Sequence, residues 1–375
     1  MSSIIIYTLI IIIIITKISG LFVYLIRYYD LKEIFFWILA KKQGIRNVVY
    51  FKNLDKNSIE TINNVLNLKI KGNFIEHLIA TPAWKPILSL ESVDNQEWEV
   101  VKKNFLYFIN KIELNNNLLG QYVKYYTQEY INSGQIIDSI IISKITVKSF
   151  CKFLFDQEID QNKLDILYNG SIEWRKEISI KGQANYQIKL ASIQIILDII
   201  KLNNKVYNIF GNNWEKPEYY SVILQPFIIS PMINISDIMV NAQILLSKNI
   251  ILPNDYVSTE LINKIIYSYH PFPVLERFDP ETSTQYFIPL DKLTNFDNYN
   301  DIYKSLVFGT GIRKCAGQTY VYIFLKSFLT IYFQNQNKFN PMINHKFSGR
   351  NNDNFNLDET IYMSKVLLKI ISQKN

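Results

Sequence analysis

Apolar residues return every three or four positions along most of the chain, which is the spacing of amphipathic helices. Between residues 95 and 210 few glycines or prolines break this pattern. A further apolar stretch with the same spacing follows residue 317 near the C-terminus. The pattern predicts helices over 56–68, 95–114, 119–131, 136–155, 161–181, 185–210 and 318–333.

Three prolines interrupt the helical pattern after residue 212. Pro217, Pro226 and Pro231 predict a loop region, because proline lacks the N–H group that a helix interior requires. The apolar residues 233–252 then predict one more helix, for which Ser236 is a fair N-cap.

Short segments outside the helical pattern predict a small amount of sheet. Residues 47–52 predict a strand, and residues 274–290 predict a hairpin. Residues 31–42 predict a short helix with an apolar face that ends at Gly44. This helix either lies on a membrane surface or packs as the first helix of the fold. No internal repeat or low-complexity linker divides the chain.

The N-terminus is an almost unbroken apolar run. Residues 4–26 are long enough to cross ~30 Å of hydrocarbon, although Lys17 interrupts them. A charge at mid-span costs about 3 kcal/mol, unless its long stem reaches the interface. A cleaved signal peptide is the alternative, since residues 4–15 alone have the length of its apolar region. Because positive charges such as Arg27 and Lys32 follow the run, we favour a signal anchor with the main domain cytoplasmic.

Composition excludes several classes of protein. The 375 residues are 48% hydrophobic and 19% charged, which is typical of a chain with a large packed core. The net charge of +7 suits an anionic membrane or an acidic protein, but no basic run of five residues indicates nucleic-acid binding. The 2 cysteines exclude a disulfide framework, and the 3 histidines lack metal-ligand spacing. No P-loop and no nucleophile elbow is present.

The candidate chemistry lies in residues 308–317, where glycines bracket Cys315 just before a predicted helix. Glycine permits positive φ and a close approach of backbone to a ligand. A helix N-terminus lowers the pKa of a thiol, and the thiolate is the form that binds a soft metal such as iron. The segment therefore predicts a tight loop that presents one thiolate. The alternative is a free, buried cysteine in a glycine-rich turn.

This segment resembles the haem-ligand loop of the cytochrome P450 family, F-x-x-G-x-R-x-C-x-G. Phe308, Gly311, Arg313, Cys315 and Gly317 meet every fixed position. The resemblance implies haem (heme b, iron protoporphyrin IX) as cofactor, with Cys315 as the axial iron ligand. It also implies that Phe308 packs by the sulfur and that Arg313 pairs with a haem propionate. The implied fold is a reduced P450-like haem domain, mainly α-helical with small β-sheets.

Weaker matches extend the resemblance along the chain. Trp98 and Lys102 stand where the family carries W-x-x-x-R, whose two side chains reach a haem propionate. Lysine keeps the charge of arginine but loses its bidentate fork. Arg277 stands where a further propionate-binding arginine sits in the family.

Two family features are not found. The family's central helix carries an acidic residue beside a threonine that deliver protons to iron-bound dioxygen, whereas the stretch we match to it, 246–252, has neither. The E-x-x-R motif is also missing, since its expected positions hold Ile265 and Ser268. A buried ion pair can be replaced by smaller groups without loss of stability.

The resemblance implies a haem-thiolate monooxygenase that inserts one oxygen atom of O2 into a hydrophobic small molecule. It implies three regions: a membrane anchor over 1–26, a linker with a short amphipathic helix over 27–45, and the haem domain over 46–375. A flavoprotein reductase would supply electrons, with Lys304, Arg313, Lys314 and Lys326 as a basic docking face. The alternatives are a hydroperoxide isomerase or dehydratase of the same fold and a catalytically silent haem-binding protein.

Overall fold

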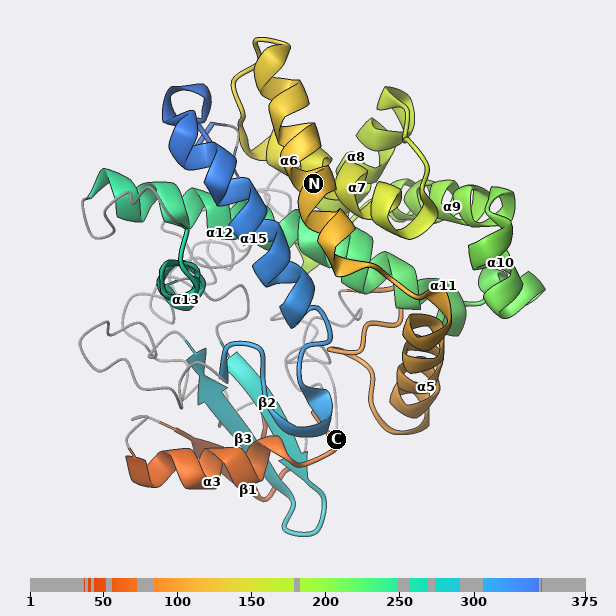
Figure 1. Cartoon of the computed structure of the whole chain (residues 1–375). Helices are drawn as coiled ribbons and strands as arrows, with labels where there is room; N and C mark the ends of the chain where they lie inside the picture. The colour runs from red at the N-terminus through yellow and green to blue at the C-terminus, as the bar shows by residue number, and fades with distance from the viewer. Residues whose placement is uncertain are drawn as a thin grey trace, which may run out of the picture.

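The computed structural model describes Trp37, Ala40, Lys41 and residues 44–51, 56–72, 84–178, 183–248, 257–268, 274–290, 306–343 and 345. Most of these residues are helical, and a three-stranded sheet lies at one end (Figure 1). The predicted membrane anchor at 1–26 lies outside the described residues. Of the short helix predicted over 31–42, the three residues described are helical, and Gly44 follows with φ 74°.

Four helices form the centre of the fold. They are α6 (Asn116–Asn132), α7 (Ser139–Phe155), α12 (Ser230–Ser247) and α15 (Gln318–Gln334). α7 packs along both α6 and α12, and α15 packs on α6. Large apolar side chains such as Phe150, Phe227 and Phe324 fill the space between them and are almost completely buried. The predicted helices 119–131, 136–155 and 318–333 are therefore confirmed.

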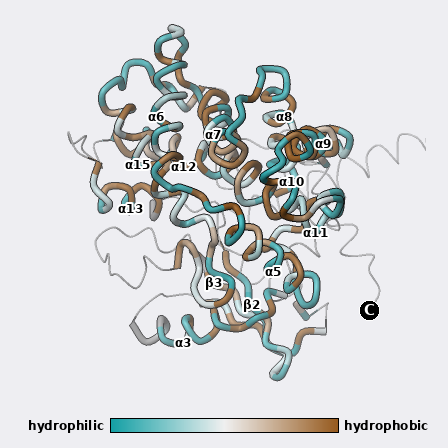
Figure 2. The backbone as a smooth tube through the Cα atoms, turned by 45° about the vertical axis from the view of Figure 1, so that its right-hand side comes forward, coloured by the Kyte–Doolittle hydropathy of each residue, from teal (hydrophilic) through white to brown (hydrophobic). Residues whose placement is uncertain are grey.

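A second group of helices packs on α7 and α12, and hydrophobic residues, coloured brown in Figure 2, recur along the helices. α8 (Gln161–Ile178) and α9 (Tyr186–Leu202) pack against each other. The single helix predicted over 185–210 is wrong in one respect, because α10 (Asn204–Phe210) starts anew after Asn203. The Asn203 side chain accepts a hydrogen bond from Val206 N at 3.0 Å and donates one to Phe155 O at 2.7 Å. The hydrogen bonds of the Asn203 side chain therefore take the place of the backbone hydrogen bonds that would continue α9 into α10.

The loop predicted around the three prolines is a helix instead. After the 3-10 turn η1 (Gly211–Glu215), α11 (Pro217–Ile223) leads through a π-helical turn, η2 (Leu224–Ile229), directly into α12. Ser230 N bonds to Gln225 O within the wide turn, which accommodates Pro226. Pro217 stands in the first turn of the helix, where a missing N–H costs little, and Pro231 directly follows the wide turn.

The helix predicted over 233–252 therefore begins well before residue 233, at Pro217. Ser236, predicted as an N-cap, lies within α12 and bonds to Met232 O at 2.8 Å. The whole helix Pro217–Ser247 is long and apolar enough to cross a membrane by length and composition alone. Most of it is buried inside the protein, which is the behaviour of a core helix.

The sheet forms the other end of the molecule. β1 (Asn47–Tyr50) pairs in parallel with β3 (Thr284–Pro289), and β3 pairs antiparallel with β2 (Val274–Asp279). α3 (Lys56–Leu66) contributes Ile62, Val65 and Leu66 to a small core that also holds Leu306 and residues of β3. The predicted strand at 47–52, the hairpin at 274–290 and the helix at 56–68 are confirmed.

Two further helices border the region between bundle and sheet. α5 (Asn95–Ile112) packs on α11, and α13 (Thr259–Ser268) packs on α12 and α15. Short 3-10 turns η5 (Gly311–Arg313) and η6 (Gln336–Lys338) flank α15. Because the segment 306–317 runs from the small core beside the sheet to the start of α15, it joins the two ends of the molecule (Figure 1).

Candidate functional site

The loop before α15 is held in a compact shape by its own backbone. Gly309 N bonds to Leu306 O at 2.9 Å, and Cys315 N bonds to Phe308 O at 2.6 Å. Gly309 and Gly311 have φ of 66° and 68°, a region that residues with side chains rarely adopt. The predicted tight loop is therefore confirmed, and its hydrogen bonds turn the chain back so that Cys315 directly precedes the helix.

Gly311 also allows a close approach between the loop and the end of α3. A Cβ atom placed there would clash with Asn67 Oδ1 and lie 3.1 Å from Leu66 O. Gly317, by contrast, has φ of −86°, so positive φ is not the reason for a glycine there. A side chain at 317 would lie 3.8 Å from the Cys315 sulfur, and glycine keeps that side of the sulfur open.

Cys315 is a free cysteine whose side chain is exposed to solvent, although protein surrounds it on several sides. Burial and the neighbouring Glu91 carboxylate raise the pKa of the Cys315 thiol to about 11. Backbone N–H groups of Gly317 and Gln318 point at the sulfur and oppose this shift, as does the Lys102 charge. The prediction that the helix N-terminus lowers the pKa is therefore wrong in its net direction, because desolvation outweighs the two N–H groups.

Two aromatic residues pack at the loop: Phe308 contacts α15, and Trp98 of α5 contacts Arg313. The Phe308 ring lies 5.8 Å from the Tyr322 ring of α15 and packs against the main core. Trp98 is buried on α5, and the Arg313 guanidinium lies 4.7 Å from its ring centroid. A cation over an aromatic face is a favourable arrangement.

Lys102 lies one turn after Trp98 and faces the loop. Burial lowers the pKa of Lys102, with the Cys315 thiolate opposing and the Arg313 charge adding to that shift. Within the described part of the chain, no hydrogen bond or ion pair engages its ammonium group. The structure therefore places the Trp98 ring against Arg313 of the loop, and the Lys102 charge acts on Cys315.

Arg313 binds the protein itself. Its guanidinium donates to Lys69 O at 2.6 Å, to Val93 O at 3.1 Å and to the Asp94 carboxylate. The side chain is 4% exposed. In the structure the guanidinium forms an ion pair with Asp94, and the Arg313 side chain is not part of an exposed basic face.

Arg277 lies on β2 next to this ion pair. It is buried and donates to Glu276 O at 2.7 Å and to Leu66 O at 3.4 Å. Burial and the Arg313 charge lower the pKa of Arg277, while Asp94 and Glu276 oppose that effect. Two guanidinium groups and one ammonium group therefore gather around the loop.

The central helix differs from our match to the family. Residues 246–252 lie at its end, since α12 stops at Ser247, and 249–252 fall outside the described residues. The middle of the helix is the π turn, where Gln225 is a buried polar residue. Between 217 and 247 the sequence has no threonine, and its buried acid, Asp237, pairs with Arg175 of α8. The acid–threonine pair is thus missing from the whole helix 217–247 and not only from the stretch matched to the family.

α13 occupies the place where the E-x-x-R motif was sought. Ile265 is completely buried in the main core. A hydrogen bond from the Tyr322 hydroxyl to Asn263 Oδ1 joins α13 to α15, and Glu260 pairs with Lys264 on the surface. Apolar packing and one neutral hydrogen bond therefore hold this helix in place of a buried ion pair.

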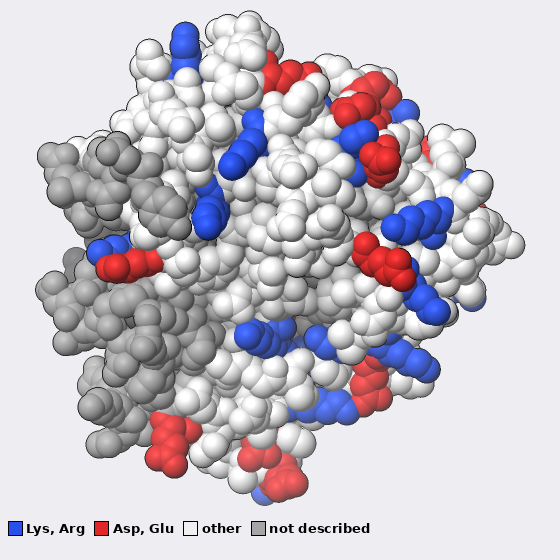
Figure 3. All heavy atoms as spheres, in the orientation of Figure 1, with Lys and Arg blue, Asp and Glu red and all other residues white. Residues whose placement is uncertain are grey.

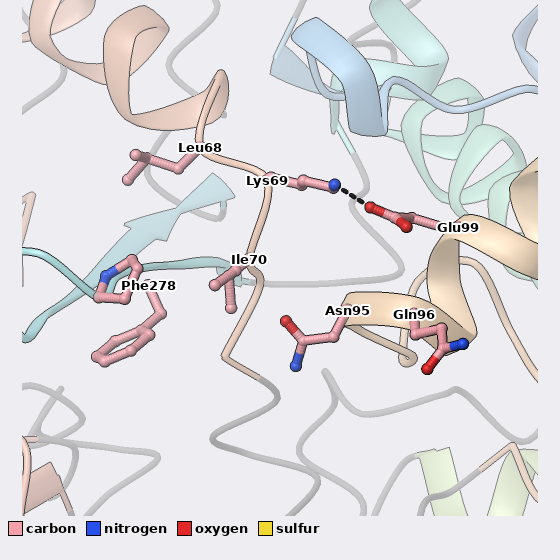
Figure 4. Close-up of a pocket in the computed structure, with 8 residues that line it drawn as sticks. Leu68, Lys69, Ile70, Asn95, Gln96, Glu99 and Phe278 are labelled. Atoms are coloured by element: carbon pink, nitrogen blue, oxygen red, sulfur yellow. Dashed lines mark hydrogen bonds and ion pairs between the residues drawn. The ribbon is translucent and has the colours of Figure 1, made fainter.

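A hollow of about 400 Å³ lies between the chain after α3 and the start of α5. Its walls are the segment Leu68–Ile70, the first turn of α5 and the β2 end at Phe278. Lys69 and Glu99 form an ion pair across it (Figure 4). Both side chains are about half exposed, so solvent weakens their attraction.

Three residues of this region were not predicted from the sequence: Asp94, Glu91 and Asn263. Asp94 carries the signal of a helix N-cap, but its carboxylate accepts from Lys71 N and Gly72 N, both at 2.9 Å, and not from α5. Asp94 and Arg313 are 219 positions apart in sequence, so no local pattern links them. Glu91 and Asn263 likewise meet the site only through the tertiary fold.

Comparison with solved structures finds cytochrome P450s at low sequence identity. CYP175A1 from Thermus thermophilus is 11% identical, with a TM-score of 0.51 over 82% of this chain and 89% of that one. The retinoic acid-bound cyanobacterial CYP120A1 is also 11% identical, with a TM-score of 0.52 over 76% of this chain and 82% of that one. No protein-family model and no curated protein matches the chain. The helical bundle, the small sheet and the cysteine loop between them together form a cytochrome P450-like fold.

Proposed function

We propose that Cys315 binds haem iron as an axial thiolate and that the chain is a membrane-anchored haem-thiolate oxidoreductase. The observation that carries this proposal is the free, solvent-accessible thiol in a loop that meets every fixed position of the family motif. The P450-like fold supports it. The reaction we favour is insertion of one oxygen atom of O2 into a hydrophobic small molecule.

The residues around Cys315 fit such a group. A single thiolate is the expected protein ligand, and the described residues contain no cluster of three or more His, Cys, Asp or Glu side chains suited to a different metal site. Backbone N–H groups at the sulfur stabilise its charged form. Lys102 and Arg277 would supply positive charge for the haem carboxylates, whereas Arg313 lies over the Trp98 ring and is engaged by Asp94.

Haem with a thiolate ligand supplies activation of O2, because the thiolate pushes electron density toward the iron and favours O–O cleavage. The chain's own task begins with the thiol proton. Because the pKa of Cys315 is about 11, this sulfur carries a proton at neutral pH, and metal binding releases it. Gly317 N–H, Gln318 N–H and the Lys102 charge then stabilise the thiolate.

The second candidate is a hydroperoxide isomerase or dehydratase that needs no reductase. The observation in its favour is the central helix, which has no threonine and whose buried acid, Asp237, is paired with Arg175. A reaction that starts from a hydroperoxide does not require proton delivery to bound dioxygen. The third candidate is a catalytically silent haem-binding protein, for which we expect haem uptake without turnover.

The membrane and the electron donor are further parts of the proposal. Residues 4–26 serve as the anchor, and a flavoprotein reductase docks near the Cys315 loop, where Lys314 and Lys326 are exposed. Figure 3 shows positive and negative side chains interspersed over this face of the molecule, a distribution that does not favour nucleic acid. A chain that lacks residues 1–26 is expected to be absent from the membrane fraction.

The absorption spectrum of the reduced, CO-treated full chain tests the proposal. We expect a thiolate-type Soret band in the wild type and in Cys151→Ala, and its loss in Cys315→Ala. Failure of the wild type to take up haem contradicts both enzymatic candidates. Turnover that depends on NADPH and a reductase supports the monooxygenase, whereas turnover of a lipid hydroperoxide without NADPH supports the isomerase.

A further inference from the structure

The central helix has one narrow strip that is not completely buried. Between residues 220 and 240 every residue is buried except Pro226 and Asn234. Ser230 lies midway between them and is 8% exposed. Because these three residues follow one another at intervals of four, they lie on one face of the helix. The neighbouring faces pack on α7 and α8, so the strip is the side on which the helix borders accessible space.

This strip points away from α7. Ser143 of α7 contacts the opposite face of the helix, because its Oγ lies 2.7 Å from Ser236 Oγ and 3.2 Å from Met232 O. Successive residues of a helix are rotated by ~100°, so Asn234, two residues from each of these partners, lies on nearly the opposite side. Figures 1 and 2 show the sheet on the side of α12 that is away from α7. The strip therefore faces the end of the molecule where the cysteine loop lies.

Two contacts connect the central helix to the cysteine loop. The ring of Phe227 in the π turn lies 5.4 Å from the ring of Tyr320, in the first turn of α15. The segment 88–90 forms the second connection, since its first residue donates a backbone hydrogen bond to Ser221 Oγ at 2.9 Å and its last accepts one from Arg313 at 3.3 Å. The helix that carries the strip and the loop that carries the thiol are therefore neighbours.

Asn234 and Ser230 present neutral hydrogen-bonding groups on this strip. Asn234 Nδ2 donates to Ser230 Oγ at 2.9 Å, and this bond orients the amide. An asparagine amide has two N–H donors and one carbonyl acceptor, and a hydroxyl has one donor. Among the residues that the structure describes, no other hydrogen bond engages either side chain. The Asn234 carbonyl oxygen, its second N–H and the Ser230 hydroxyl are therefore available to a ligand.

We propose that Asn234, oriented by Ser230, binds the O–O–H group of an organic hydroperoxide. The hydroperoxide donates its O–H to Asn234 Oδ1, and its other oxygen accepts from Nδ2, so both ends of the amide are satisfied. Dioxygen has no O–H group and would leave the carbonyl oxygen without a donor. Because a neutral amide releases no proton at neutral pH, the pair orients its ligand and does not replace an acid. The inference rests on the proposed haem-binding function and deepens its second candidate.

The infrared spectrum of the reduced, CO-treated full chain tests the position of Asn234. A hydrogen-bond donor beside bound CO lowers the C–O stretching frequency, so we expect Asn234→Leu, which has a similar shape and no amide, to shift the band to higher frequency. Gln243→Met is the matched control, because Gln243 is an amide of the same helix on nearly the opposite face, and we expect no shift. An unshifted band in Asn234→Leu would overturn the proposal.

Turnover of cumene hydroperoxide without NADPH tests the ligand. We expect Asn234→Leu to lower kcat/KM roughly tenfold, the loss of one hydrogen bond, and Gln243→Met to stay at the wild-type value. Ser230→Ala is expected to lose less, because the amide keeps its own donors and acceptor. Equal values for the wild type and Asn234→Leu would overturn the proposal. A wild type that binds haem without turning over the hydroperoxide would overturn this inference alone, whereas failure to take up haem would overturn the haem function as well.

Discussion

The Cys315 thiol illustrates how opposing local effects set the chemistry of one residue. Burial and Glu91 favour its neutral form, while two backbone N–H groups and Lys102 favour the thiolate. Because the first pair of effects is larger, the haem-free protein keeps a protonated thiol at neutral pH. Binding of a cation to the sulfur reverses this balance, since the metal competes directly with the proton.

Alkylation kinetics of the haem-free protein test this balance. In a Cys151→Ala background, Cys315 is the remaining thiol of the chain. Well below a pKa of about 11, the thiolate fraction rises tenfold per pH unit, so we expect the iodoacetamide rate to rise roughly tenfold per unit from pH 7 to pH 9. Mass spectrometry follows the modification. A rate that levels off below pH 8 would show that the thiol is activated and contradict the expectation.

Gly311 is the second residue for which the loop makes a specific demand. We expect Gly311→Ala to destabilise the fold by about 1–2 kcal/mol for its positive φ, with an additional loss from the clash with Asn67 and Leu66. Gly134→Ala is the matched control, because Gly134 has φ of 77° but no atom within 4 Å of an added Cβ. Urea unfolding of the two variants measures the difference. Equal losses would mean that the contact with α3 contributes nothing.

For single residues, the sequence predicts local chemistry well but does not predict contacts between residues that are distant in the sequence. The motif around Cys315 predicted the loop and the accessible thiol, because spacing and glycine conformation are local properties. The partner of Arg313 was not predicted, since Asp94 belongs to a different segment and approaches only in the folded protein. The net pKa of Cys315 was mispredicted for the same reason, as Glu91 and the surrounding protein are tertiary neighbours.

Among the elements, α8 and α12 are joined by a buried ion pair. Arg175 donates to the Asp237 carboxylate and to Ile233 O at 3.0 Å, and Asp237 is fully buried. His345 lies 3.0 Å from the same carboxylate. The pair therefore fixes how α8 lies across the central helix, and loss of one partner leaves a charge in the core.

We expect Arg175→Met to lower the free energy of unfolding by about 3–5 kcal/mol, because Asp237 then loses the buried partner whose positive charge is permanent. Replacing both residues, as Arg175→Met with Asp237→Leu, is expected to cost less than the single change. Lys201→Met is the control, since solvent weakens the exposed pair of Lys201 with Glu215 and its loss is expected to change stability little. Denaturant titration of these variants measures the losses. A small effect of Arg175→Met would contradict the role assigned to the pair.

The helical pattern predicted most elements, and its errors have physical causes. Helices were predicted wherever apolar periodicity is strong, as in α5, α7 and α15. The loop around Pro226 was mispredicted because a wide π turn accommodates the proline within a helix, and periodicity gives no sign of such a turn. The break at Asn203 was missed because the apolar spacing continues through it, although asparagine is a common N-cap residue and its side chain accepts from Val206 N.

The described part of the chain contains a large apolar core and a small one. The large core fills the helical bundle, and the small one lies between α3 and β3. The cysteine loop belongs to both, because Leu306 is part of the small core while Phe308 and Ala316 pack against the large one. A ligand at Cys315 therefore binds where the two cores meet.

Hydrogen exchange tests this organisation. In the haem-free chain we expect amides of β1–β3 and α3 to exchange before those of α7 and α12, because fewer buried side chains protect them. Addition of haem is expected to slow exchange most in the sheet, α3 and the loop. Cys315→Ala serves as the control and is expected to gain little protection. A uniform gain over the bundle and the sheet would contradict a binding site at their junction.

The π turn at Leu224–Ile229 sets the rotational phase of everything that follows it in the central helix. Such a turn holds one residue more than an α-helical turn, and each residue rotates a helix by ~100°. Deletion of a single codon there would let the backbone become regular and would swing Ser236 away from Ser143 and Asp237 away from Arg175. One extra residue, placed next to a proline, thus decides which neighbours the second half of this helix meets.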